Sequence, residues 1–80
     1  MKYVYILKSK IKQNKFYTGI SKDVMKRLQY HNSGQSPYSS NFKPWELITY
    51  IAFSDSSKAY EFEKYLKTGS GRAFAKKHLR

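Results

Sequence analysis

The sequence predicts a small mixed fold of the α/β (α+β) type, with its elements in the order β-β-α-β-α-α. Three separate segments are rich in aromatic and β-branched residues and too short for stable helices, which is typical of strands. Two other segments and the tail carry apolar residues at helical spacing. Because the 80 residues contain no repeat and no long linker, we expect one domain over residues 1–80.

The first two predicted strands form a hairpin. Lys2–Lys8 is a continuous apolar run between lysines, which is typical of a strand covered on both faces. The polar segment 9–14 then predicts a connection, and Lys15–Ile20 returns antiparallel. In such a hairpin Tyr5 and Tyr17 lie on the same side of the sheet and close together. Strand alternation separates two groups of the first strand: Tyr3, Tyr5 and Leu7 on one face, Val4 and Ile6 on the other.

The third predicted strand is Trp45–Phe53. It is apolar on both faces, so we expect it to be central or well covered. The segment 34–44 before it is rich in Gly, Ser, Pro and Asn and has no apolar period, which predicts a loop.

The first predicted helix spans Val24–Ser33, with Ser21 or Asp23 as its N-cap and Gly34 as a left-handed stop. The second spans Lys58–Lys67, after a cap within the segment 54–57. Its apolar stripe faces the core and consists of Ala59, Phe62 and Leu66.

The basic tail 68–80 is expected to break at Gly69 and Gly71 and then to resume as a short helix. Its inward side chains would be Ala73, Phe74 and Leu79.

The composition points to a polyanionic partner. Sixteen Lys and Arg against five Asp and Glu give a formal net charge of +11, accompanied by eight Tyr, five Phe and one Trp. Such charge attracts nucleic acid, and aromatic rings can stack on bases; a merely solvated basic surface is the alternative. Charge and composition favour neither DNA nor RNA as this partner. The candidate nucleic-acid-binding side chains are Lys22, Lys26, Tyr38, Asn41, Lys43, Lys67, Arg72 and Lys76.

Other classes of protein are excluded by what the sequence lacks. The absence of cysteine excludes a disulfide framework and removes the usual structural zinc ligands. No apolar run approaches the roughly 18 residues of a membrane span, and the N-terminal segment has no small-residue cleavage site. We therefore expect a soluble cytoplasmic protein with no membrane partner, while the oligomeric state stays open.

Few carboxylates are available to a divalent cation. Asp23 and Asp55 have the positions of helix caps, and Glu46 starts a strand, so each has a structural explanation. On the second helix Glu61 falls away from the apolar stripe, whereas Glu63 falls on its shoulder beside buried surface. Spacing alone also allows an ordinary surface pair of Glu63 with a lysine four residues later.

Five residues together resemble the GIY-YIG nuclease domain, and the match covers nearly the whole chain. They are Tyr5 in YVY, Tyr17 in YTG, Arg27, His31 four residues later on the same helix flank, and Glu63 on a later helix. The tail AYEFEKYLKTGSGRAFAKKHL resembles the small, single-domain bacterial branch of that family. The resemblance implies a three-stranded antiparallel sheet flanked by helices and cleavage of a DNA phosphodiester with one divalent metal.

The resemblance also assigns roles to these catalytic candidates. It implies that Glu63 holds a single Mg²⁺ or Mn²⁺ and that Arg27 stabilises the phosphate. It implies that Tyr5 and Tyr17 line the reaction centre, where one of them, most often the second, accepts the proton of the attacking water. His31 is a competing base or proton relay, because an imidazole titrates near neutral pH.

Three functions follow from these observations. The first is a metal-dependent DNA endonuclease of repair or processing type, structure-dependent or nonspecific because the chain carries no separate recognition domain. The second is a catalytically silent, basic nucleic-acid-binding module. The third is a purely structural basic protein.

Overall fold

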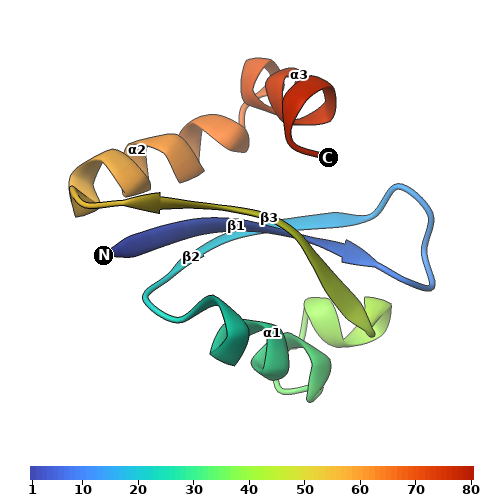
Figure 1. The fold of residues 1–80 in the computed structure, drawn as a ribbon. Coiled ribbons are helices and arrows are strands. Elements are labelled where there is room, and N and C mark those ends of the chain that lie inside the picture. Colours follow the sequence, from blue (N-terminus) through green and yellow to red (C-terminus); the bar gives the residue numbers. More distant parts are fainter.

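The computed structural model describes residues 1–80 as a three-stranded sheet between two helical layers (Figure 1). The strands pair antiparallel in the order β2-β1-β3, which confirms the predicted fold class. The elements are β1 Lys2–Ser9, β2 Phe16–Ser21, α1 Val24–Asn32, the 3₁₀ turn η1 Ser39–Phe42, β3 Trp45–Phe53, α2 Ser56–Leu66 and α3 Gly69–His78.

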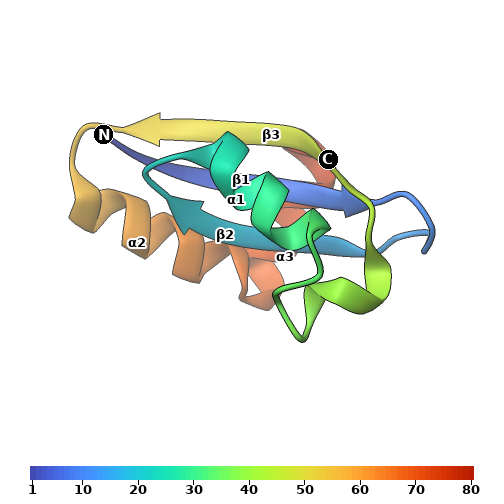
Figure 2. The same ribbon diagram turned by 90° about the horizontal axis from the view of Figure 1, so that it is seen from below.

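The two faces of the sheet are covered by different helices. Helices α2 and α3 lie on one side of it, and α1 with η1 lies on the other (Figures 1 and 2). On β1, Val4 and Ile6 pack in the core beneath α2 and α3, whereas Tyr5 and Leu7 pack with Val24 at the start of α1. This is the predicted alternation, and all four side chains are buried, as the central position of β1 in the sheet allows.

The hairpin register leaves space for one aromatic ring. Tyr5 pairs with Gly19, and Leu7 pairs with Tyr17, so Tyr5 and Tyr17 share a face as predicted. A Cβ on Gly19 would lie 2.5 Å from the hydroxyl oxygen of Tyr5. The Tyr5 ring therefore crosses β2 at the one position that has no side chain, and its hydroxyl extends toward the outer edge of the sheet.

β3 is an edge strand, so of the two predicted alternatives, a central strand or a well-covered one, the first is wrong and the second holds. Although β3 is at the edge, apolar residues on both of its faces are covered. Leu47 packs on the α1 side, and Ile48 and Phe53 pack on the α2 side. Tyr50 is 56% exposed, as an edge strand allows. Apolar residues on both faces thus indicate two covered faces and do not reveal the order of strands.

The helix ends follow the predicted capping residues. The Asp23 side chain accepts a hydrogen bond from the backbone N–H of Lys26, and Gly34 after α1 has a φ of +85°. Asp55 caps α2 by accepting from the N–H of Ser57. The predicted stripe of α2 is also confirmed, since Ala59 and Leu66 are buried and Phe62 packs against them.

Helix α3 differs from its prediction. It begins at Gly69 without a break and is capped by Thr68, whose hydroxyl accepts from the N–H of Gly71. Gly71 is buried because α3 crosses closely over the end of α2, where an added Cβ would overlap the carbonyl oxygen of Tyr65. The inward residues are Gly71 and Ala75 with Leu79, whereas Ala73 and Phe74, predicted to face inward, are exposed. No helix of the chain has the length and apolar character needed to cross a membrane.

Candidate active site

Four of the five predicted catalytic residues lie together on the face of the sheet that α1 covers. The hydroxyl of Tyr5 is 3.2 Å from Nε2 of His31, and the ring of Tyr17 packs on His31 with centroids 4.4 Å apart. The two tyrosine rings are 6.4 Å apart. Arg27, one turn before His31, lies close enough to Tyr5 to lower the pKa of that phenol. Two strands and one helix therefore bring two phenols, an imidazole and a guanidinium into one cluster.

His31 is not a polar residue on an exposed helix flank, because its side chain is completely buried. Its second ring nitrogen, Nδ1, is 2.8 Å from the hydroxyl of Ser39. Ser39 belongs to the short 3₁₀ turn η1, which lies in the segment 34–44 predicted as a loop. Burial lowers the pKa of His31, and the nearby charge of Arg27 lowers it further, so the imidazole is neutral at pH 7.

The two phenols differ in their environments. Tyr5 is 1% exposed, and burial raises its pKa above the usual value; the Arg27 guanidinium opposes that rise, while Tyr17 and Glu63 add to it. Tyr17 is only partly buried and lies on the edge strand. Of the two hydroxyl groups, that of Tyr17 is therefore the one that a substrate can reach, whereas Tyr5 is held inside the cluster.

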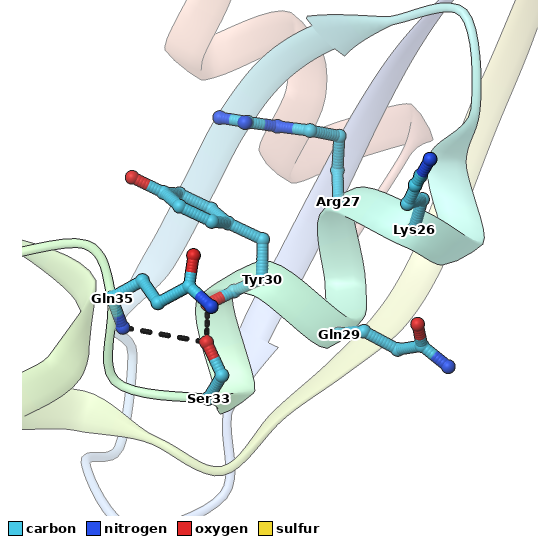
Figure 3. Close-up of a pocket in the computed structure, with 6 residues that line it drawn as sticks. All are labelled: Lys26, Arg27, Gln29, Tyr30, Ser33 and Gln35. Carbon is cyan, nitrogen blue, oxygen red and sulfur yellow. Dashed lines mark hydrogen bonds between the residues drawn. The ribbon is translucent and has the colours of Figure 1, made fainter.

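Arg27 lies at the rim of a shallow pocket on α1, the α1 pocket, with a volume of about 530 Å³. Its guanidinium carbon is 4.4 Å from the centroid of the Tyr30 ring, and both side chains project in the same direction, away from Gln29 (Figure 3). The buried Nε of Arg27 has no hydrogen-bond partner. Tyr5 raises the pKa of Arg27, so the group is a permanent cation with donors left for an anion.

Glu63 comes from α2, on the other side of the sheet. Its side chain is 16% exposed, compared with 70% for Glu61, as their positions relative to the apolar stripe predicted. The carboxylate forms an ion pair with Lys67, which is the ordinary i, i+4 pair that the spacing allowed. It also lies close enough to Tyr5 to raise the pKa of that phenol. Glu63 is thus largely shielded from solvent and lies within electrostatic range of Tyr5.

The two layers meet along the outer edge of β2, where a groove runs beside the cluster. Tyr17 and Tyr38 contribute to it from the α1 side, and Lys67 contributes from α2. Three cations and three aromatic rings thus line one open surface, which suits a phosphate backbone and its bases. This β2-edge groove is lined by Phe16, Tyr17, Thr18, Tyr38, Lys67, Arg72 and Arg80.

The predicted nucleic-acid-binding residues are only partly brought together. Tyr38, Lys67 and Arg72 line the β2-edge groove, Lys76 lines the adjoining hollow with Phe16 and Arg80, and Lys26 lines the α1 pocket. Lys22 lies elsewhere, in a hollow with Tyr3 and Tyr50 on the β3 side. Asn41 is exposed on η1, and the Lys43 ammonium lies against Gly34.

Some residues at the site were not predicted. Tyr30 is three residues after Arg27, so helical spacing was a signal that marked it as a neighbour. Arg80 stacks on the ring of Phe16 at 4.3 Å, a contact between the C-terminal residue and β2 for which the sequence has no local signal. Ser39 is likewise placed by the fold alone.

The donors present fit a metal held partly by its substrate. No group of three or more His, Cys, Asp or Glu side chains is arranged to enclose a metal ion. Mg²⁺, however, commonly keeps several waters and takes one or two carboxylates together with substrate phosphates. Glu63 supplies one carboxylate beside the cluster, so it fits such a site provided that Lys67 releases it. Lys67 is 54% exposed and therefore has room to move.

Comparisons with known proteins find one matching family model and several relatives. The family model described as the GIY-YIG catalytic domain matches residues 1–77. A UPF0213 protein of Staphylococcus saprophyticus is 38% identical over 69 residues, covering 85% of this chain and 82% of that protein. The UPF0213 protein YazA of Bacillus subtilis is 35% identical over 66 residues, covering 81% of this chain and 65% of YazA. No solved structure matches the chain significantly.

Proposed function

This chain belongs to the GIY-YIG catalytic domain family, and from that premise we propose that it is a metal-dependent DNA endonuclease of repair or processing type. Membership implies nuclease-type activity on nucleic acid, and GIY-YIG nucleases generally use divalent metal ions. The observation that supports the proposal is the packing of Tyr5, Tyr17, Arg27 and His31 into one cluster, with Glu63 within electrostatic range of Tyr5.

Arg27 is the proposed phosphate-binding residue. Attack on a phosphodiester increases negative charge on the nonbridging oxygens, and a planar guanidinium can donate to two of them at once. The Tyr30 ring supports one side of the guanidinium, and Tyr5 holds it from the interior. Arg27 is therefore preorganised, so little side-chain entropy is lost when the phosphate binds.

Tyr17 is the proposed proton acceptor for the attacking water. It is the phenol that lines the β2-edge groove, and its ring packs on the neutral His31. A phenol with a pKa near ~10 is a weak base at neutral pH unless cations stabilise its phenolate. Lys67 lines the same groove and Arg27 belongs to the same cluster, so positive charge is available on both sides of Tyr17.

Glu63 is the proposed ligand for a single Mg²⁺ or Mn²⁺. A bound divalent cation would supply Lewis-acid stabilisation of the phosphate and of the leaving oxygen. Lys67 would leave the Glu63 carboxylate and turn into the β2-edge groove, which it already lines, and there it can contact a backbone phosphate.

The proposed substrate is DNA cleaved in a structure-dependent or nonspecific way, by one nuclease domain over residues 1–80 acting in the cytoplasm. Lysine and arginine contacts to phosphates position a nucleic acid but do not read its sequence. The three basic residues of the β2-edge groove, Lys67, Arg72 and Arg80, are of this kind.

The experiment that tests this proposal is a cleavage panel of duplex, nicked, branched and single-stranded DNA, with matched RNA, in Mg²⁺, in Mn²⁺ and in a chelator. We expect at least one form of DNA to be cleaved, and we expect the chelator to stop this cleavage. The chain would instead be a silent binding module if no form were cut while binding still weakened steeply with salt, as phosphate contacts require.

A further inference from the structure

A chain of three polar side chains crosses the interior beside the proposed site. It runs from the hydroxyl of Tyr5 to Nε2 of His31 at 3.2 Å, and from Nδ1 of His31 to the hydroxyl of Ser39 at 2.8 Å. Tyr5 is 1% exposed, and His31 and Ser39 are not exposed at all. Because no solvent reaches these groups, their hydrogen bonds depend on one another. The position of each proton is therefore set by the three hydrogen-bonded side chains themselves.

The surroundings of Tyr5 determine the direction of these hydrogen bonds. The Arg27 guanidinium lies near the Tyr5 hydroxyl and lowers the pKa of that phenol, so the Tyr5 oxygen faces a group that has only donors. The hydrogen of the Tyr5 hydroxyl is then free to point at His31, whose Nε2 must accept it. A neutral imidazole that accepts at Nε2 carries its hydrogen on Nδ1, which donates to the Ser39 oxygen.

Ser39 is itself fixed by the indole of Trp45. Nε1 of Trp45 donates to the backbone carbonyl of Ser39 at 2.9 Å, and the backbone N–H of Trp45 donates to the side chain of Asn32 at 2.6 Å. Trp45 is 2% exposed. The 3₁₀ turn η1 is therefore tied to both β3 and the end of α1, so the Ser39 hydroxyl has little freedom to move away from His31.

We propose that Ser39 is a positioning residue, which holds His31 in the tautomer protonated on Nδ1 and thereby turns the Tyr5 oxygen toward Arg27. The inference rests on the proposed function in one respect, that Arg27 is the group which meets the phosphate. Ser39 does not touch the substrate. It acts through His31 and Tyr5 on the orientation of the guanidinium, and through the His31 ring on the packing of Tyr17.

The test is nitrogen NMR of the histidine side chains in the native protein and in Ser39→Ala, at a pH where both histidines are neutral. We expect His31 in the native protein to be protonated on Nδ1, and Ser39→Ala to shift it toward a mixture or toward the Nε2 form. Ser40→Ala is the matched control, because its hydroxyl donates to the carbonyl of Pro37 and does not contact His31. An Nε2-protonated His31 in the native protein overturns the proposal without any variant, and so does an unchanged tautomer in Ser39→Ala.

Kinetics provide a second readout. Ser39→Ala should lower kcat about tenfold with KM nearly unchanged, as loss of a supporting hydrogen bond commonly does. A kcat equal to that of the native protein would contradict the positioning role. The tautomer is measured without substrate, so the two proposals can fail separately. If the protein cleaves nothing, the nuclease proposal is overturned, and the NMR result still decides whether Ser39 sets the tautomer of His31.

Discussion

Replacing Glu63 with glutamine should reduce metal-dependent cleavage by about a thousandfold or more, because it removes the only carboxylate beside the cluster and with it several kcal/mol of metal stabilisation. Glutamine keeps the size and shape of the side chain. The lost ion pair with Lys67 is partly exposed and stabilises the fold by less than about 1 kcal/mol, so the variant should fold normally. The measurement is single-turnover cleavage at saturating Mn²⁺, with a thermal melt to check the fold.

Glu61→Gln is the matched control for this prediction. It makes the same chemical change two residues earlier on α2, at a side chain that is 70% exposed and paired only with Lys58. It should retain native activity. Equal activity in the Glu63 and Glu61 variants would exclude Glu63 as the metal ligand, and a similar loss in both would indicate a general effect of charge.

Arg27→Ala should lower kcat by about a hundredfold to a thousandfold, the usual effect of removing one strong donor from a developing oxyanion. Arg27→Lys should recover only part of this loss, because an ammonium keeps the charge but cannot donate to two oxygens in a fixed plane. Arg27 lowers the pKa of Tyr5, so its removal lets that pKa rise further.

The control for Arg27 is Lys26→Ala, which removes a cation from the same α1 pocket without touching Tyr5. It should weaken DNA binding modestly and leave the rate at which bound DNA is cleaved unchanged. A native kcat in Arg27→Ala would contradict the role proposed for the guanidinium, and a large loss in Lys26→Ala would mean that the pocket acts through its total charge.

Local patterns predicted most of the fold. Alternation along β1 separated Tyr5 and Leu7 from Val4 and Ile6, and Asp23 and Gly34 marked the ends of α1, because these features depend on neighbours in the sequence. The edge position of β3 depends on strand order, which no local pattern records. Glycines ordinarily interrupt helices, so the continuous start of α3 was missed. There the close approach of α2 requires the absence of a side chain at Gly71.

The candidate site shows the same division. Helical spacing placed Arg27 and His31 on one flank, and the hairpin put Tyr5 beside Tyr17. Ser39 lies eight residues after His31 in a segment with no apolar period, and only the folding of η1 against Trp45 brings it to the imidazole. The β2-edge groove combines residues of β2, of both helical layers and of the C-terminus, so its composition is a property of the tertiary structure.

The most direct test of the proposed site is to map where Mn²⁺ binds by paramagnetic broadening of backbone NMR signals in the absence of DNA. We predict that the signals of Glu63, Lys67 and Tyr17 broaden first and that Glu63→Gln abolishes this pattern. Broadening confined to the helix caps Asp23 and Asp55, or an unchanged pattern in Glu63→Gln, would contradict the assignment of Glu63 as the metal ligand.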